Sequence, residues 1–278
     1  HVCYRTSILK THSFNFQTFM KSTTLITGAS SGIGMELARI FAREGHNLLL
    51  TARREERLKQ LKASLEPEFD IEAAIFPCDL SEPEAPKALF DFCNKNKIEI
   101  NTLVNNAGIG DFGLFIESDW NKQAVMIDLN VRALTHLTHL FLPMLVQQNR
   151  AYIMNVASTA AFQPGPLMSV YYASKHYVLA FGEAIAEELK ESGVTVTTLC
   201  PGPTKSEFQE TAGMEKSGLF KKFAVATSDE VAEYGYRAMM KGKRIAVYGI
   251  LNKISAASVQ LLPSRLVTPV VKRIQSAE

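Results

Sequence analysis

The feature that most constrains the fold is a regular alternation of short apolar runs with longer amphipathic patterns. The runs are rich in leucine and β-branched residues, and most are soon followed by an apolar spacing typical of helices. They span residues 23–27, 47–51, 71–76, 102–104, 151–157 and 195–199. Strands that are connected through helices run parallel and bury both of their faces. The sequence therefore predicts a single α/β domain built on a doubly wound parallel sheet.

A glycine-rich turn follows the first predicted strand and leads directly into a helical pattern at 35–43. It reads Gly28-Ala29-Ser30-Ser31-Gly32-Ile33-Gly34. A strand, a glycine turn and a helix together offer free N–H groups and the positive end of a helix dipole to a phosphate. The Gly-x3-Gly-x-Gly spacing differs from the common Gly-x-Gly-x-x-Gly fingerprint, and a purely structural turn is the alternative. We expect a Rossmann-type nucleotide-binding domain.

Chemically distinctive segments follow several of the predicted strands, each at the carboxyl end of its strand. In an open parallel sheet, ligands bind outside the carboxyl ends of the strands. The segments are Gly28 to Gly34, Arg53, Asp79, Asn106 to Gly108, Ser158 and Pro201-Gly202. We therefore expect one binding site at this edge of the sheet.

The residues after the second strand predict which dinucleotide binds. NAD sites commonly carry an acid about 20 residues beyond the glycines, where it binds the ribose 2′-hydroxyl. This chain has Ala52 at that place and Arg53 next to it. A cation suits a 2′-phosphate, so the sequence favours NADP(H). In the alternative interpretation, Arg53 and Arg54 merely begin a solvated and highly charged helix.

One segment carries the pattern expected of a catalytic acid. On a helix, residues four apart share a face, so Tyr171 and Lys175 point into the same space and Tyr172 points elsewhere. A phenol has an ordinary pKa of about 10, and we expect the neighbouring ammonium to lower it. Ser158 follows a buried strand, where its hydroxyl can bond a carbonyl oxygen that Tyr171 protonates. Such Tyr–Lys pairs also arise by chance, but the surrounding motifs favour a catalytic role for this pair.

Composition excludes several other classes of protein. A net charge of +2 is too weak to indicate nucleic-acid binding, and 46% hydrophobic residues allow a sizeable core. The four cysteines show no paired spacing, which favours reduced thiols and a cytoplasmic location. His136 and His139 have no evident third ligand, so we expect no metal site.

The two ends of the chain differ from the alternating region between them. Residues 1–19 lack the apolar stretch of a signal peptide and look like a disordered arm or added sequence, so the domain is expected to span residues 20–250. Residues 251–278 form an apolar C-terminal extension that we expect to pack on the domain or on a partner subunit. Pro263 and Pro269 argue against a spanning helix, and flanking basic residues leave peripheral membrane contact as an alternative.

Together these segments resemble the short-chain dehydrogenase/reductase family, over about residues 21–250. The shared motifs are Thr27 to Gly34, Asp79, Asn105-Asn106-Ala107-Gly108, Asn130, Ser158, Tyr171-x-x-x-Lys175 and Pro201-Gly202. The resemblance implies an oxidoreductase that transfers hydride between NADP(H) and a carbonyl compound or secondary alcohol, working as a homo-oligomer. NAD-linked alcohol oxidation and a non-catalytic NADP-binding regulator are the alternatives.

The resemblance also implies roles for the matching residues. Tyr171 would donate the proton, Ser158 would orient the carbonyl, and Lys175 would hold the nicotinamide ribose. Asn130 would fix a water that passes protons to Lys175. The three glycines would approach the pyrophosphate, and Asp79 would bond the adenine. The full set of expected cofactor contacts is Gly28, Ser30, Ser31, Gly32, Ile33, Gly34, Arg53, Asp79, Leu80, Asn106, Ala107, Gly108, Lys175, Pro201, Gly202 and Thr204.

The loops expected to hold the substrate are rich in large apolar residues, which favours a lipophilic or acyl carbonyl compound. These residues are Phe112, Phe115, Phe162, Met168, Phe208, Met214, Leu219 and Phe220. In the alternative, they pack within their own loops or against a partner subunit. The family often has Thr where this chain has Ser206, so the resemblance leaves either Thr204 or Ser206 to reach the nicotinamide carboxamide.

Overall fold

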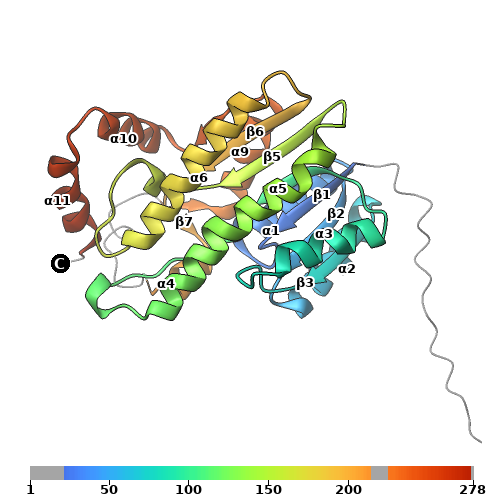
Figure 1. Ribbon diagram of the computed structural model, residues 1–278, viewed down its shortest axis with the longest axis horizontal. Coiled ribbons are helices and arrows are strands. Elements are labelled where there is room, and N and C mark those ends of the chain that lie inside the picture. The colour runs from blue at the N-terminus through green and yellow to red at the C-terminus, as the bar shows by residue number, and fades with distance from the viewer. Residues whose placement is uncertain (1–21, 214–224, 277–278) are drawn as a thin grey trace, which may run out of the picture.

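A computed structural model describes residues 22–213 and 225–276 of the chain. The predicted arm at residues 1–19 lies outside the described residues, as do Met214, Leu219 and Phe220. The described chain folds around one seven-stranded sheet in the order β3-β2-β1-β4-β5-β6-β9, with every pair of neighbouring strands parallel (Figure 1). Its strands are β1 (Thr23–Thr27), β2 (Asn47–Ala52), β3 (Ala73–Pro77), β4 (Ile100–Asn105), β5 (Ala151–Val156), β6 (Val194–Cys200) and β9 (Ile245–Val247).

The chain begins in the middle of this sheet and winds outward in both directions. Strands β1, β2 and β3 build one half, and strands β4, β5, β6 and β9 build the other half. Leu48, Leu49 and Leu50 of β2 are all fully buried, although alternate side chains of a strand point to opposite faces. Such runs form only when both faces of a sheet are covered. The structure thus confirms the predicted doubly wound α/β sheet of a single Rossmann-type domain.

Helices cover both faces of the sheet, and each face has its own apolar core. On one face lie α1 (Gly32–Arg43), α2 (Glu55–Phe69) and α9 (Ser228–Met240), with Phe41 of α1 fully buried. On the other face lie α3 (Ala85–Lys95), α5 (Leu134–Leu145) and α6 (Ser169–Glu188), with Phe141 of α5 fully buried (Figure 1). This double cover is what leaves only the ends of the strands accessible to a ligand.

The helical region between β4 and β5 changes type along its length. The structure has α4 (Trp120–Ile127), a π-helical segment (Asp128–Ala133) and then α5. The three pieces continue one another, and the π segment places Asn130 against the loop after β4, since the Asn130 side chain bonds both backbone groups of Ile109. A π turn inside a helix often marks a functional site.

The C-terminal residues form α10 (Ile250–Gln260) and α11 (Ser264–Gln275), which lie at one end of the molecule (Figure 1). Val267 and Val271 of α11 pack in a small apolar cluster with Met168 and Tyr172, close to the start of α6. No helix in the described residues is long and apolar enough to cross a membrane. Assembly through this extension and contact with a membrane surface stay predictions.

A two-stranded sheet completes the fold. Its strands are β7 (Thr204–Lys205) and β8 (Ala226–Thr227), and the short helix α7 (Phe208–Thr211) follows β7. The chain leaves the main sheet after β6 to build this unit. It therefore lies beside the carboxyl ends of the strands, where the predicted site is expected.

Candidate active site

A cleft with a volume of about 390 Å³ opens at the carboxyl edge of the main sheet. Most of the residues predicted from the sequence line it. From the predicted cofactor set, these are Gly28, Ser30, Ser31, Gly32, Ile33, Arg53, Asp79, Leu80, Asn106, Ala107, Gly108, Lys175, Pro201, Gly202 and Thr204, and from the catalytic set they are Ser158, Tyr171 and Lys175. Gly34 and Asn130 do not line the cleft.

The glycine turn offers the cleft a set of unpaired backbone donors. The first residues of α1, Gly32 and Ile33, line the cleft. Within residues 22–213 and 225–276, no side chain caps this helix terminus, and its first turn holds no acid. Gly28 has a φ of +67°, and a Cβ there would lie 2.9 Å from the Cα of Ala107. The turn therefore keeps its shape only with glycine, and its free N–H groups suit a pyrophosphate.

Gly34 has a different role from the predicted one. It lies behind the turn, where a Cβ would meet the Gly28 carbonyl oxygen at 2.4 Å and the Asn106 side chain at 2.3 Å. The missing side chain lets Asn106 Nδ2 donate to the carbonyl of Thr27 at 2.8 Å. Gly34 thus permits close packing of α1 against the loop after β4 and does not approach the cleft.

The acid predicted to bind adenine is held in a defined orientation. Asp79 Oδ1 accepts hydrogen bonds from both the backbone N–H and the hydroxyl of Ser81, at 3.0 and 2.7 Å. Its other oxygen lies 3.7 Å from Arg53 Nη1 in an exposed ion pair. The Arg53 side chain is 62% exposed. A cation therefore stands at the end of β2, where the ribose of a dinucleotide is expected.

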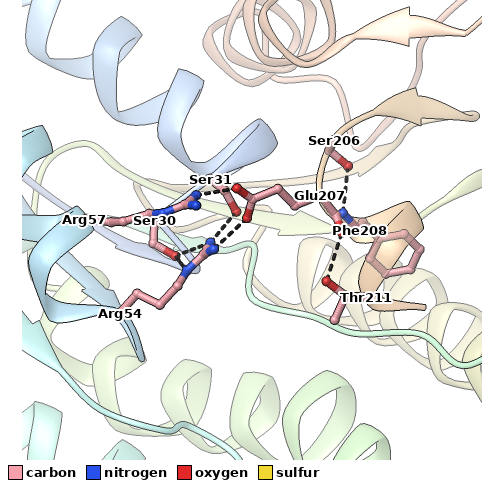
Figure 2. Close-up of polar contacts among 8 residues, drawn as sticks. All are labelled: Ser30, Ser31, Arg54, Arg57, Ser206, Glu207, Phe208 and Thr211. Carbon is pink, nitrogen blue, oxygen red and sulfur yellow. Dashed lines mark hydrogen bonds and ion pairs between the residues drawn. The ribbon is translucent and has the colours of Figure 1, made fainter. Parts of the chain in front are cut away.

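Two more arginines at the start of α2 were not predicted as site residues. Arg54 donates to the hydroxyl of Ser30 at 3.0 Å and to that of Ser31 at 2.9 Å, so its side chain lies against the glycine turn. Its Nη1 also donates to Glu207 at 2.7 Å, and Arg57 binds the same carboxylate (Figure 2). Arg54 was visible in the sequence beside Arg53, but nothing in the local pattern indicated a partner more than 150 residues away.

Ser158, Tyr171 and Lys175 meet at the middle of the cleft. Ser158 follows β5, accepts from the backbone N–H of Ala160 at 3.1 Å and donates to the carbonyl of Pro201 at 3.4 Å. Lys175 Nζ lies 5.8 Å from the centre of the Tyr171 ring and donates to the carbonyl of Val156 at 2.9 Å. The helical spacing of α6 therefore brings the tyrosine and the lysine together as predicted.

The pKa of Tyr171 differs from the expectation. Burial raises the pKa of Tyr171 to about 12, and the nearby Ser158 hydroxyl offsets only part of this rise. The predicted lowering by Lys175 is therefore wrong in this structure, because loss of solvent around the phenol outweighs the effect of its neighbours. The phenol is fully protonated at neutral pH, which is the form that a proton donor needs.

Lys175 is itself a strongly perturbed group. Its side chain is 5% exposed, and burial lowers its pKa to about 8. A lysine with so low a pKa can change its protonation state close to physiological pH. Perturbed titratable groups that share a cleft are typical of active sites.

Asn130 is buried close to the cleft but does not line it, unlike Ser158, Tyr171 and Lys175. It is 1% exposed, and its amide exchanges hydrogen bonds with both backbone groups of Ile109, at 3.0 and 2.9 Å. It also donates to the Ser174 hydroxyl at 3.0 Å. Every polar atom of the Asn130 side chain thus has a protein partner. A relay through Asn130 to Lys175 stays a prediction.

Among the described residues, only some of the apolar side chains predicted to surround the substrate line the cleft. Met168 and Phe208 line the cleft, and the Phe208 ring packs against Tyr171 at 5.4 Å between centres. Phe115 is exposed, and Phe162 packs against a different cluster. Tyr172, expected to point elsewhere, also reaches the lining and accepts a hydrogen bond from Gln275 of α11 at 2.6 Å. The sequence carried no signal for that contact.

Comparison with known proteins decides the family. The family model described as short chain dehydrogenase matches residues 22–217, which is more than half of the chain. The chain belongs to the short-chain dehydrogenase family. It is therefore an oxidoreductase of alcohol and carbonyl groups, and it belongs to a family that binds a nicotinamide cofactor.

Relatives within the short-chain dehydrogenase family act on different compounds. The chain is 35% identical over 226 residues to sulfoacetaldehyde reductase 2 of Chromohalobacter salexigens, covering 77% of this chain and 86% of that protein. A short-chain dehydrogenase from Sphingobium yanoikuyae in complex with NADPH is 31% identical, with a TM-score of 0.78 over 85% of this chain and 92% of that one. A Burkholderia phymatum family member in complex with NAD has a TM-score of 0.77 at 24% identity, covers 85% of this chain and 92% of that one, and is alike in fold only.

Proposed function

We propose that this chain reduces a lipophilic ketone or aldehyde with NADPH, and oxidises the corresponding alcohol with NADP⁺. The observation that carries the proposal is the convergence of Tyr171, Ser158 and Lys175 in one cleft whose opposite end holds Arg53 and Arg54. The first three are the groups needed for carbonyl chemistry, and the two arginines are the groups that favour a phosphorylated ribose.

The residues of the cleft fit a dinucleotide along its whole length. The uncapped start of α1 suits the pyrophosphate, Asp79 suits the adenine, and Lys175 suits the nicotinamide ribose. When bound, the nicotinamide supplies or accepts the hydride. Pro201, Gly202 and Thr204 line the cleft beside Ser158 and are the proposed contacts of the nicotinamide end.

The protein's own part of the chemistry is a proton transfer. Ser158 donates a hydrogen bond to the carbonyl oxygen and fixes its position next to Tyr171. The Tyr171 O–H then passes its proton to that oxygen as negative charge develops on it, and the ammonium of Lys175 stabilises the phenolate that is left. Lys175 is buried and Tyr171 is partly buried, so less water competes with these interactions than at the surface.

The apolar end of the cleft supports a lipophilic substrate. Met168, Phe208 and Tyr172 line the cleft together with Tyr171, and Val267 and Val271 of α11 belong to the same apolar cluster. Such a surface binds hydrocarbon and disfavours charged groups. A small anionic carbonyl compound is therefore a poorer candidate than a bulky neutral ketone.

The test is turnover of a panel of neutral lipophilic ketones and aldehydes with NADPH and with NADH, for the wild type and for Arg53→Ala. We expect kcat/KM at least about tenfold higher with NADPH, because a cation contact to phosphate is worth roughly 1.5–3 kcal/mol. In Arg53→Ala the value for NADPH falls about tenfold, and that for NADH stays within about twofold.

The matched control is Arg237→Ala, an arginine of α9 that is 70% exposed and outside the cleft. Arg237→Ala should change kcat/KM neither with NADPH nor with NADH. Equal use of NADH and NADPH by the wild type would contradict the proposed cofactor preference and favour NAD-linked oxidation. Binding of NADPH without turnover of any carbonyl compound or alcohol would favour a non-catalytic regulator.

A further inference from the structure

A single carboxylate binds two of the arginines at the adenosine end of the cleft. Glu207 lies between β7 and α7, and it comes from a part of the chain far from the glycine turn. One of its oxygens accepts from Arg54 at 2.7 Å, and the other binds Arg57 (Figure 2). The two cations hold the pKa of Glu207 below its ordinary value, so the group is ionised at neutral pH.

The same arginine belongs to the cofactor side of the cleft. Arg54 donates to the hydroxyls of Ser30 and Ser31, which lie in the glycine turn and line the cleft. Arg54 lies two residues beyond the end of β2, the strand whose end carries the ribose of a dinucleotide. Glu207 also lines the cleft. An anion held by Arg54 at this point thus occupies the place where an anionic substituent on the adenosine ribose would bind.

We propose that Glu207 is a specificity-determining residue, because its carboxylate competes with the 2′-phosphate of the cofactor for Arg54 and Arg57. The inference rests on the proposed use of NADP(H). A phosphate monoester carries close to two negative charges and three acceptor oxygens, so it displaces the single carboxylate from these guanidinium groups. A 2′-hydroxyl lacks the charge to do so, and Glu207 therefore sets the strength with which phosphate is recognised.

Displacement of Glu207 also acts on the segment that carries it. The next residue, Phe208, packs against the Tyr171 ring, and its backbone N–H donates to the Ser206 hydroxyl at 3.4 Å (Figure 2). Glu207, which binds the arginines, and Phe208, which contacts the catalytic tyrosine, are thus adjacent in the chain. Binding of phosphate and the position of the β7–α7 segment are coupled through this one residue.

The experiment compares two probes that differ only in the phosphate, adenosine 2′,5′-bisphosphate and adenosine 5′-monophosphate, by calorimetric titration of the whole chain. We expect Glu207→Gln to tighten binding of the bisphosphate about three- to tenfold, since each exposed ion pair removed is worth a few-fold in affinity. Binding of the monophosphate should stay within about twofold. The matched control is Glu210→Gln, an exposed acid on α7 that does not line the cleft, which should change neither affinity.

Three results would overturn the inference. In the first, Glu207→Gln leaves the affinity for the bisphosphate unchanged or weakens it, which means that Glu207 only holds the segment in place. In the second, both probes change equally, which means that the effect does not pass through the phosphate. In the third, the wild type binds the two probes with equal affinity, and this contradicts the NADP(H) preference of the proposed function as well. If the wild type binds the bisphosphate more tightly than the monophosphate, and Glu207→Gln binds the bisphosphate as tightly as the wild type does, this inference is rejected while the proposed NADP(H) preference stands.

Discussion

Tyr171→Phe is expected to lower kcat for carbonyl reduction by about a thousandfold or more while leaving the affinity for NADPH within about twofold. The substitution removes only the hydroxyl that donates the proton, and general acid catalysis contributes roughly 10²–10⁴ in rate. The ring itself stays and keeps its packing against Phe208. The measurement is kcat from initial rates, with NADPH affinity from fluorescence titration of the same preparations.

The neighbouring tyrosine supplies a matched control. Tyr172→Phe also removes one phenolic hydroxyl from the same helix, and it breaks the buried hydrogen bond from Gln275. It should lower the free energy of unfolding by about 1–3 kcal/mol, because the Gln275 amide loses a buried partner. Its kcat should stay within about tenfold of the wild-type value. If Tyr171→Phe retained wild-type turnover, or if Tyr172→Phe lost as much as Tyr171→Phe, the assignment of the acid would be wrong.

Lys175→Met is expected to lower kcat about a hundredfold or more and to change how stability depends on pH. The turnover falls because the variant lacks the ammonium that stabilises the Tyr171 phenolate. In the wild type, the folded pKa of Lys175 is about 8, below its ordinary value of 10.5. Between these two values the unfolded chain holds a proton that the folded chain has released, so wild-type stability rises with pH in this window.

The effect is measured as a difference between the two proteins. From pH 7 to pH 9.5, the stability of the wild type relative to Lys175→Met should increase on the order of 2 kcal/mol, since one pKa unit corresponds to about 1.4 kcal/mol. Other groups titrate in both proteins and cancel in the comparison. The measurement is urea unfolding at both values of pH. A constant difference would show that Lys175 has an ordinary pKa, and unchanged turnover in the variant would remove it from the catalytic groups.

Much of the fold could be predicted because its determinants are local and periodic. The run Leu48-Leu49-Leu50 indicates a strand buried on both faces, and the turn from Gly28 to Gly32 indicates the start of a helix beside it. Once the sheet is parallel, topology brings the ends of the strands together at one edge. The approach of Ser158 to Tyr171 follows from this rule, although the two residues lie on different elements.

The contacts that were missed depend on geometry that no local pattern carries. Glu207 reads as an ordinary loop acid, yet it binds Arg54 from the other half of the sheet. Gln275 reads as a polar residue of a surface helix, yet it is fully buried against Tyr172. The raised pKa of Tyr171 depends on how completely its surroundings exclude water, which becomes known only once the chain is folded. Packing of distant elements decides these properties, and helical or strand spacing does not.

The most direct test of the proposed reaction follows the hydride itself. Two preparations of NADPH, each carrying deuterium at one of the two positions on C4 of the nicotinamide, are incubated with the chain and its best lipophilic ketone, and the mass of the alcohol product is measured. We expect one deuterium in the alcohol from one of the two preparations, and no alcohol when Tyr171→Phe is used over the same time. An alcohol without deuterium from both preparations would contradict hydride transfer in this cleft.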